Sequence, residues 1–184
     1  MEIKITTRQI LKVLYILSWL IFVGICIDTG GVIFNAIYAF FFKPIVAKYF
    51  WNGLDLSSLF QFDRGYFLVE TFLMSIVGIM KAIMFYLIIK LIHDKKLNLL
   101  KPFSNEVRKF IFTLVFLTFG IGLFSSWAVN YAEWFESKGV IMPDINLLKI
   151  DGAGVWLFMS VVLFIIAQIF KRGIEIQEEN ELTV

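Results

Sequence analysis

The chain has 184 residues, of which 59% are apolar, and its mean hydropathy is +0.81. Soluble domains use about 45–50% apolar residues, and one domain of this length cannot hide the excess from water, so the sequence predicts an integral membrane protein. The formal net charge of +2 gives no indication of direct nucleic-acid binding. Cys26 and His93 are the single cysteine and histidine, which excludes an intrachain disulfide and a Cys-rich metal site.

No cofactor, metal site or enzymatic activity is expected. The sequence has no Gly-rich phosphate loop, no His-x-x-x-His pair and no Cys-x-x-Cys pair. Ser75 and Ser160 fall inside apolar runs, whereas His93 falls at the end of one. An intramembrane hydrolase would therefore lack the base that activates its serine.

Four apolar runs provide the roughly 20 residues that a helix needs to cross a bilayer. They cover about residues 10–42, 66–92, 110–131 and 153–170. The first run exceeds that length, which predicts a helical extension beyond the outer boundary or an interfacial segment. It lacks a small-x-small cleavage site, which argues against a signal peptide. Short connections favour one all-α membrane domain, an antiparallel four-helix bundle, followed by an acidic tail at 174–184.

Polar residues recur at helical spacing on one face of each of the first two runs. They include Asp28 and Asn35 on the first, and Glu70 and Lys81 on the second. A lysine in the middle of a span costs about 2.5–3.5 kcal/mol on insertion scales, so Lys81 is predicted to face the bundle.

Two interpretations of these residues stay open. In one, Asp28, Asn35, Glu70 and Lys81 form a ligand or ion site, and the two acids share a polar pocket. In the other, they form a structural seam in which Lys81 meets a carbonyl or a hydroxyl such as that of Thr118 or Ser160, and the acids meet lipid headgroups.

Basic residues are distributed unequally between the two sides of the predicted spans. Eleven lysines and arginines flank the termini and the loop between the second and third runs, against five on the opposite side. The positive-inside rule therefore predicts that the N-terminus and the C-terminus are both cytoplasmic.

The loop between the second and third runs contains a helix start. Pro102 stops a helix arriving from the second run. Ser104 is a good N-cap, and Glu106 suits the first turn of the following helix. The acidic tail is solvated, packed against this basic loop or bound by a partner. Together with the tail, the loop offers a docking face for a soluble protein. Its candidate residues are Lys95, Lys96, Lys101, Phe103, Arg108, Glu178 and Glu179.

Three stretches carry a resemblance to a known family: GLDLSSLFQF, LLKPFSNEV and IAQIFKRGIEIQEENELTV. With these the chain resembles domain-of-unknown-function family 2975, bacterial four-span membrane proteins, over almost its whole length. The resemblance implies the bacterial cytoplasmic membrane. Members of the family are often encoded beside a helix-turn-helix regulator of the Cro/CI type, which implies a membrane protein that binds or modulates a cytoplasmic repressor. The resemblance assigns no catalytic residues.

Three functions are therefore compatible with the sequence. The first is a regulatory or sensing membrane protein whose cytoplasmic face binds a soluble transcription regulator. The second is a small transporter or ligand-binding bundle that uses the polar seam, and transport through only four spans would require a homo-oligomer. The third is a purely structural membrane protein.

Overall fold

The computed structural model describes residues 7–94 and 103–181, and these residues form helices and connecting turns without a β-strand. The four long helices are α1 (Thr7–Phe41), α3 (Arg64–His93), α4 (Asn105–Ser137) and α6 (Ala153–Glu181). The short segments between them are η1 (Pro44–Ala47), η2 (Trp51–Gly53), α2 (Ser57–Phe62) and α5 (Ile145–Leu148). The prediction of an all-α bundle with four long apolar helices is confirmed.

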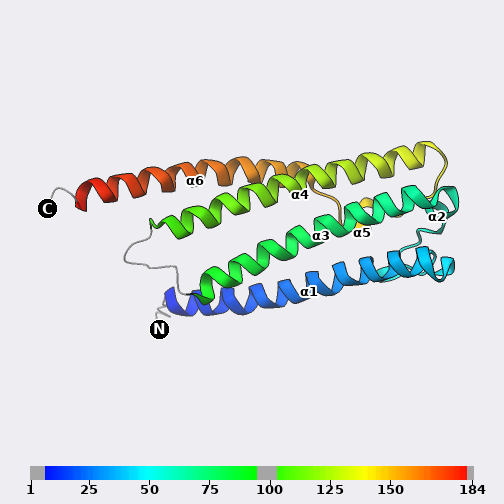
Figure 1. The fold of residues 1–184 in the computed structure, drawn as a ribbon, viewed down its shortest axis with the longest axis horizontal. Coiled ribbons are helices and arrows are strands. Elements are labelled where there is room, and N and C mark those ends of the chain that lie inside the picture. Colours follow the sequence, from blue (N-terminus) through cyan, green and yellow to red (C-terminus); the bar gives the residue numbers. More distant parts are fainter. Residues whose placement is uncertain (1–6, 95–102, 182–184) are drawn as a thin grey trace, which may run out of the picture.

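The long helices run antiparallel, so α1 begins and α6 ends at the same end of the molecule, here called the terminal end (Figure 1). The short segments lie toward the opposite end, the loop end. Each long helix is long and apolar enough to cross a membrane, which makes the chain a multi-pass membrane protein. The 35 residues of α1 are one continuous helix, about 52 Å long at 1.5 Å per residue. That length exceeds the roughly 30 Å of a bilayer core, so the end of the first run is a helical extension.

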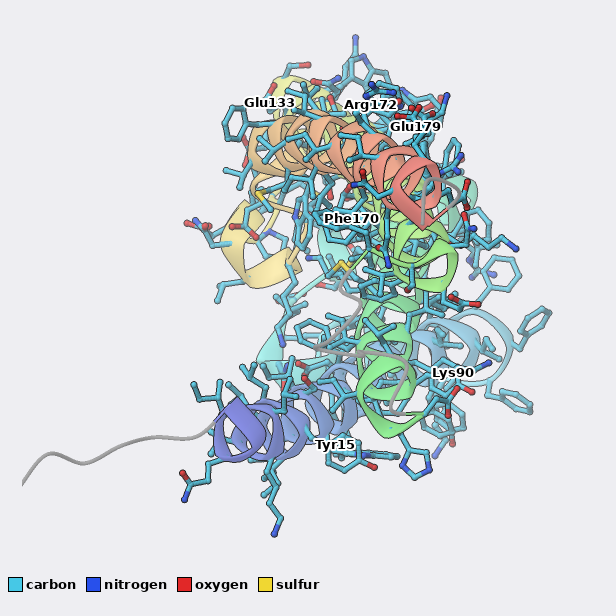
Figure 2. The ribbon with its side chains drawn as sticks, turned by 90° about the vertical axis from the view of Figure 1, so that its left-hand side faces the viewer. Tyr15, Lys90, Glu133, Phe170, Arg172 and Glu179 are labelled. Carbon is cyan, nitrogen blue, oxygen red and sulfur yellow. The ribbon has the colours of Figure 1, made fainter. Side chains whose placement is uncertain are left out.

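The helices pack in chain order, with α1 against α3, α3 against α4, and α4 against α6. Seen along the helices, α6 and α1 lie on opposite sides, with α4 and α3 between them (Figure 2). The axial offset of α6 differs from that of the other three. Its first turns lie beside the middle of α3, because the Lys81 ammonium is 5.5 Å from the centre of the Trp156 ring. As a result α1, α3 and α4 continue past α6 at the loop end (Figure 1).

The largest buried cluster lies at the loop end, where the short segments pack between the long helices. Phe67 of α3 makes edge contacts with Phe50 and Phe60, with ring centres 6.1 and 5.0 Å away. Fully burying one such side chain contributes about 1.5–3 kcal/mol. Leu148 and Ile150 belong to the same cluster, so these two residues anchor the chain between α4 and α6 to the fold.

The terminal end confirms the predicted helix cap and changes the picture of the acidic tail. The Ser104 hydroxyl accepts a hydrogen bond from the Val107 N–H at 3.3 Å, as an N-cap does. Residues of the predicted tail continue α6 as far as Glu181. Ion pairs one turn apart favour this extension, with Arg172 and Lys171 3.1 and 3.9 Å from the Glu175 carboxylate.

Candidate functional site

Two of the four predicted polar-seam residues, Asp28 and Lys81, line one pocket. It lies where α1, η2, α3 and α5 meet, and its cavity volume is about 90 Å³. One water needs about 10–15 Å³ measured in this way, so the cavity has room for several waters or a small molecule. The lining consists of Ile25, Asp28, Thr29, Val32, Trp51, Asn52, Leu54, Met74, Gly78, Lys81, Leu147, Leu148 and Lys149.

Asp28 is the polar centre of the pocket. Its Oδ2 forms an ion pair with Lys149 Nζ at 2.5 Å. Its Oδ1 accepts hydrogen bonds from Trp51 Nε1 at 3.2 Å and from Asn52 Nδ2 at 3.1 Å. One carboxylate on α1 therefore holds both η2 and the residue that follows α5.

Lys81 approaches the same segment from α3. Its ammonium donates a hydrogen bond to the Lys149 carbonyl at 3.1 Å. The same ammonium lies over the ring of Trp156. The prediction that Lys81 meets a carbonyl is thus confirmed. The hydroxyls of Thr118 and Ser160 instead donate to carbonyls of their own helices.

Asp144 fixes the start of α5 and so the position of Lys149. Its carboxylate accepts hydrogen bonds from the backbone N–H and the side-chain amide of Asn146, both at 2.7 Å. These bonds favour the charged form and hold the pKa of Asp144 below its ordinary value.

Two residues of the pocket have a strained backbone. Among the residues that the structure describes, Asn52 and Lys149 are the two non-glycine residues with positive φ, at 56° and 58°. The left-handed conformation costs an L-residue about 1–2 kcal/mol, less for asparagine. Strain of this kind persists where the surrounding contacts hold it, and it clusters at functional sites. Both side chains contact Asp28.

Glycine at two positions makes room for the pocket wall. A Cβ at Gly31 would overlap the ring of Trp51, and a Cβ at Gly78 would overlap Thr29. The first contact seats η2 against α1, and the second brings α1 close to α3. Small residues commonly allow such close approach between membrane helices.

The other two predicted seam residues lie elsewhere. Asn35 donates to the Gly31 carbonyl of its own helix at 2.8 Å. Glu70 does not line the pocket, so it is not the partner of Asp28 that the sequence suggested. It is completely buried, one turn along α3 from Met74, and neither carboxylate oxygen has a hydrogen-bond partner among the described residues.

Sequence reasoning missed Trp51, Asn52 and Lys149. Trp51 had the features of an interfacial aromatic residue, and Lys149 those of a charge beside a span. Trp51 and Asn52 lie in the three-residue segment η2, and Lys149 follows the four-residue helix α5. Segments this short show no helical periodicity in the sequence. Only the folded loop brings them to Asp28.

Of the predicted docking residues that the structure describes, Phe103, Arg108 and Glu179 contact their own chain. Phe103 packs on Phe170 with ring centres 5.3 Å apart, and the Arg108 guanidinium is 5.8 Å from the Phe112 ring centre. Arg172 lies 3.9 Å from the Glu179 carboxylate on α6, where Glu178 is also exposed. Lys95, Lys96 and Lys101 lie outside the described residues.

Comparisons with protein-family models, with curated proteins and with solved structures find no match to this chain. Function is therefore inferred from the pocket and from the two ends of the bundle.

Proposed function

We propose that this chain is a regulatory or sensing membrane protein that binds a small ligand in the loop-end pocket. The observation that carries this proposal is that the residues with a strained backbone are also polar residues of the pocket. Asn52 and Lys149 both adopt the left-handed backbone, both line the cavity and both contact Asp28. Natural sequences retain such local conflicts chiefly where function requires them.

We further propose that the terminal end is cytoplasmic and that the membrane is the bacterial cytoplasmic membrane. The excess of basic residues beside the terminal end supports this orientation. The pocket then opens on the outer side, away from the cytoplasmic partners of the chain.

The position of the pocket favours binding over transport. A transporter places its substrate site near the middle of the bilayer and opens it to each side in turn. Lys81 lies beside the middle of α3, but the segments that close the pocket, η2 and α5, lie toward the loop end, whereas the terminal end holds an apolar cluster of Val107, Ile111 and Ala167. A purely structural protein would have no use for a cavity that combines a strained backbone with charged side chains.

A ligand screen by thermal shift tests the proposal. The protein is purified into lipid nanodiscs and exposed to small anions, cations and neutral metabolites. A ligand at 100 times its Kd stabilises the folded state by about 2.7 kcal/mol. We expect at least one class to raise the melting temperature of the wild type, and Asp28→Asn to abolish the shift. Asn35→Ala is the matched control, because Asn35 bonds its own helix outside the pocket. The proposal fails if no class shifts the wild type, or if Asp28→Asn responds like the control.

A second function concerns the terminal end, where α6 extends toward the solvent. Arg172 and Glu179 lie on the side of α6 away from the other helices, and Phe170 on the side toward α4 (Figure 2). Ordered acidic residues on a projecting helix support docking of a soluble protein. The resemblance described above makes a helix-turn-helix regulator the partner to test.

The docking function is tested with a purified helix-turn-helix regulator of the Cro/CI type, the partner class that the resemblance implies. We expect Glu178→Lys combined with Glu179→Lys to weaken binding at least tenfold, which is about 1.4 kcal/mol. Glu133→Lys, an exposed acid at the loop end, serves as the control. Equal affinity for all three proteins would exclude this helix as the docking surface.

A further inference from the structure

We propose that the pocket binds an organic anion with a short apolar body, and that Lys81 holds the negative group. This inference rests on the proposed function, because it names the class of ligand for the same cavity. It follows from the charge balance of the pocket, the hydrogen-bonding capacity of Lys81 and the character of the remaining walls.

The charge balance leaves one positive charge without a partner in the lining. Asp28 and Lys149 neutralise each other in an ion pair. Asp28 also accepts from Trp51 and Asn52, so three donors already surround its carboxylate. Lys81 is the remaining charged side chain of the lining.

Lys81 keeps donor capacity that its own chain does not use. An ammonium group has three N–H donors, and one of them bonds the Lys149 carbonyl. The Trp156 ring occupies one side of the ammonium, at 5.5 Å. Asp151 attracts Lys81 from farther away, but no carboxylate among the described residues lies within the 4.0 Å of an ion pair. A ligand anion would provide the close partner.

The other walls select an apolar body. Beyond the polar group, the cavity is bounded by Ile25, Val32, Leu54, Met74, Leu147 and Leu148. Its volume of about 90 Å³ suits a chain of a few carbons. Ligand pockets typically combine such apolar walls with a few polar groups that fix orientation.

At a membrane surface, a negative group attached to an apolar chain can come from two sources. A soluble short-chain carboxylate would enter from the aqueous side, whereas an anionic phospholipid would offer its phosphate from the bilayer. The test therefore includes one arm for each source.

The experiment measures binding in nanodiscs of zwitterionic lipid by thermal shift and calorimetry. The probes are hexanoate, hexylamine and hexanol, which share one apolar chain and differ in charge. A parallel arm replaces the lipid with a phosphatidylglycerol mixture. We expect hexanoate or the anionic lipid to stabilise the wild type, and hexylamine and hexanol to have no comparable effect.

Variants of Lys81 assign the effect to the ammonium group. We expect Lys81→Met to weaken anion binding at least tenfold and Lys81→Arg to retain most of it. Lys138→Met is the control, because Lys138 is an exposed lysine beside Trp134, outside the pocket. Retention by Lys81→Arg also shows that substitution at this position does not simply unfold the protein.

The outcomes separate this inference from the proposed function. If hexylamine or hexanol binds in an Asp28-dependent manner and no anion does, the anion inference is overturned and the pocket remains a ligand site. If anion binding is the same in Lys81→Met and the wild type, the inference is also overturned. If no probe or lipid of any charge binds, both proposals fail.

Discussion

Lys149 makes two opposing contributions to stability, a favourable ion pair and an unfavourable backbone conformation. Its ion pair with Asp28 is partly exposed, with 54% of the lysine side chain accessible. Such pairs contribute about 1 kcal/mol or less. The left-handed backbone at the same residue costs about as much or more. Lys149 is therefore retained at a position where glycine would fit the backbone better.

At Lys149 we expect glycine to be a more stable replacement than alanine, the reverse of the order at most positions. Both Lys149→Ala and Lys149→Gly remove the ion pair. The difference between their free energies of unfolding therefore measures the cost of the left-handed backbone. We expect Lys149→Gly to be the more stable by about 1 kcal/mol, because alanine retains the left-handed strain. Chemical unfolding in detergent measures the difference. If Lys149→Ala is the more stable variant, the backbone at this residue is not left-handed.

Glu70 gives a second prediction about stability. A buried polar group without a partner costs about 1–3 kcal/mol. Methionine has a similar size, and Phe67, Leu73 and Met74, which are close to Glu70 along α3, belong to the large apolar cluster. We expect Glu70→Met to raise the free energy of unfolding by that amount. Glu133→Met, at an exposed acid of the same end, is expected to change it by less than about 0.5 kcal/mol. A destabilised Glu70→Met would show that Glu70 has a polar partner in the membrane-bound protein.

Contacts between long helices depend on small residues at particular places. A Cβ at Gly122 of α4 would overlap Leu157 of α6, whereas a Cβ at Gly24 of α1 would meet no neighbouring atom within 4 Å. We expect Gly122→Val to lower the free energy of unfolding by about 1–3 kcal/mol through overpacking. Gly24→Val is the matched control and should cost far less. Equal effects would mean that α4 and α6 are not in close contact at Gly122.

The long helices could be predicted because length and apolar composition determine them locally. The Ser104 cap was also predictable, since a capping residue acts within one turn. The helical extension of α6 to Glu181 was less evident, because its acidic composition also suits a solvated tail. Pairs such as Arg172 with Glu175 appear only once the helix is assumed. The loop segments depend on tertiary contacts and could not be predicted in detail.

At the scale of the whole molecule, the axial offset of α6 changes the environment of Lys81. From its position along α3, Lys81 was predicted near the middle of a span. In the structure it lies beside the first turn of α6, at the edge of the pocket. The offset between helices is a tertiary property that no single apolar run reveals.

The candidate site was predictable only in part. Asp28 and Lys81 are charged residues within apolar runs, and their cost in lipid indicates a role. Trp51, Asn52 and Lys149 come from two separate loops, and their contact with Asp28 required the folded loop end. Glu70 was predicted by the same rule as Asp28, but it is buried outside the pocket lining, with no hydrogen-bond partner among the described residues.

The central claim is that the loop-end pocket faces outward and binds a small ligand. Leu147 lines the pocket and is 61% exposed, so Leu147→Cys in a Cys26→Ala background reports access to it. The decisive measurement is the rate at which a membrane-impermeant maleimide labels this cysteine in intact cells. We predict labelling without permeabilisation, slowed several-fold by hexanoate, with no slowing when Lys81→Met is added. Labelling that requires permeabilisation, or a rate that hexanoate leaves unchanged, would contradict the claim.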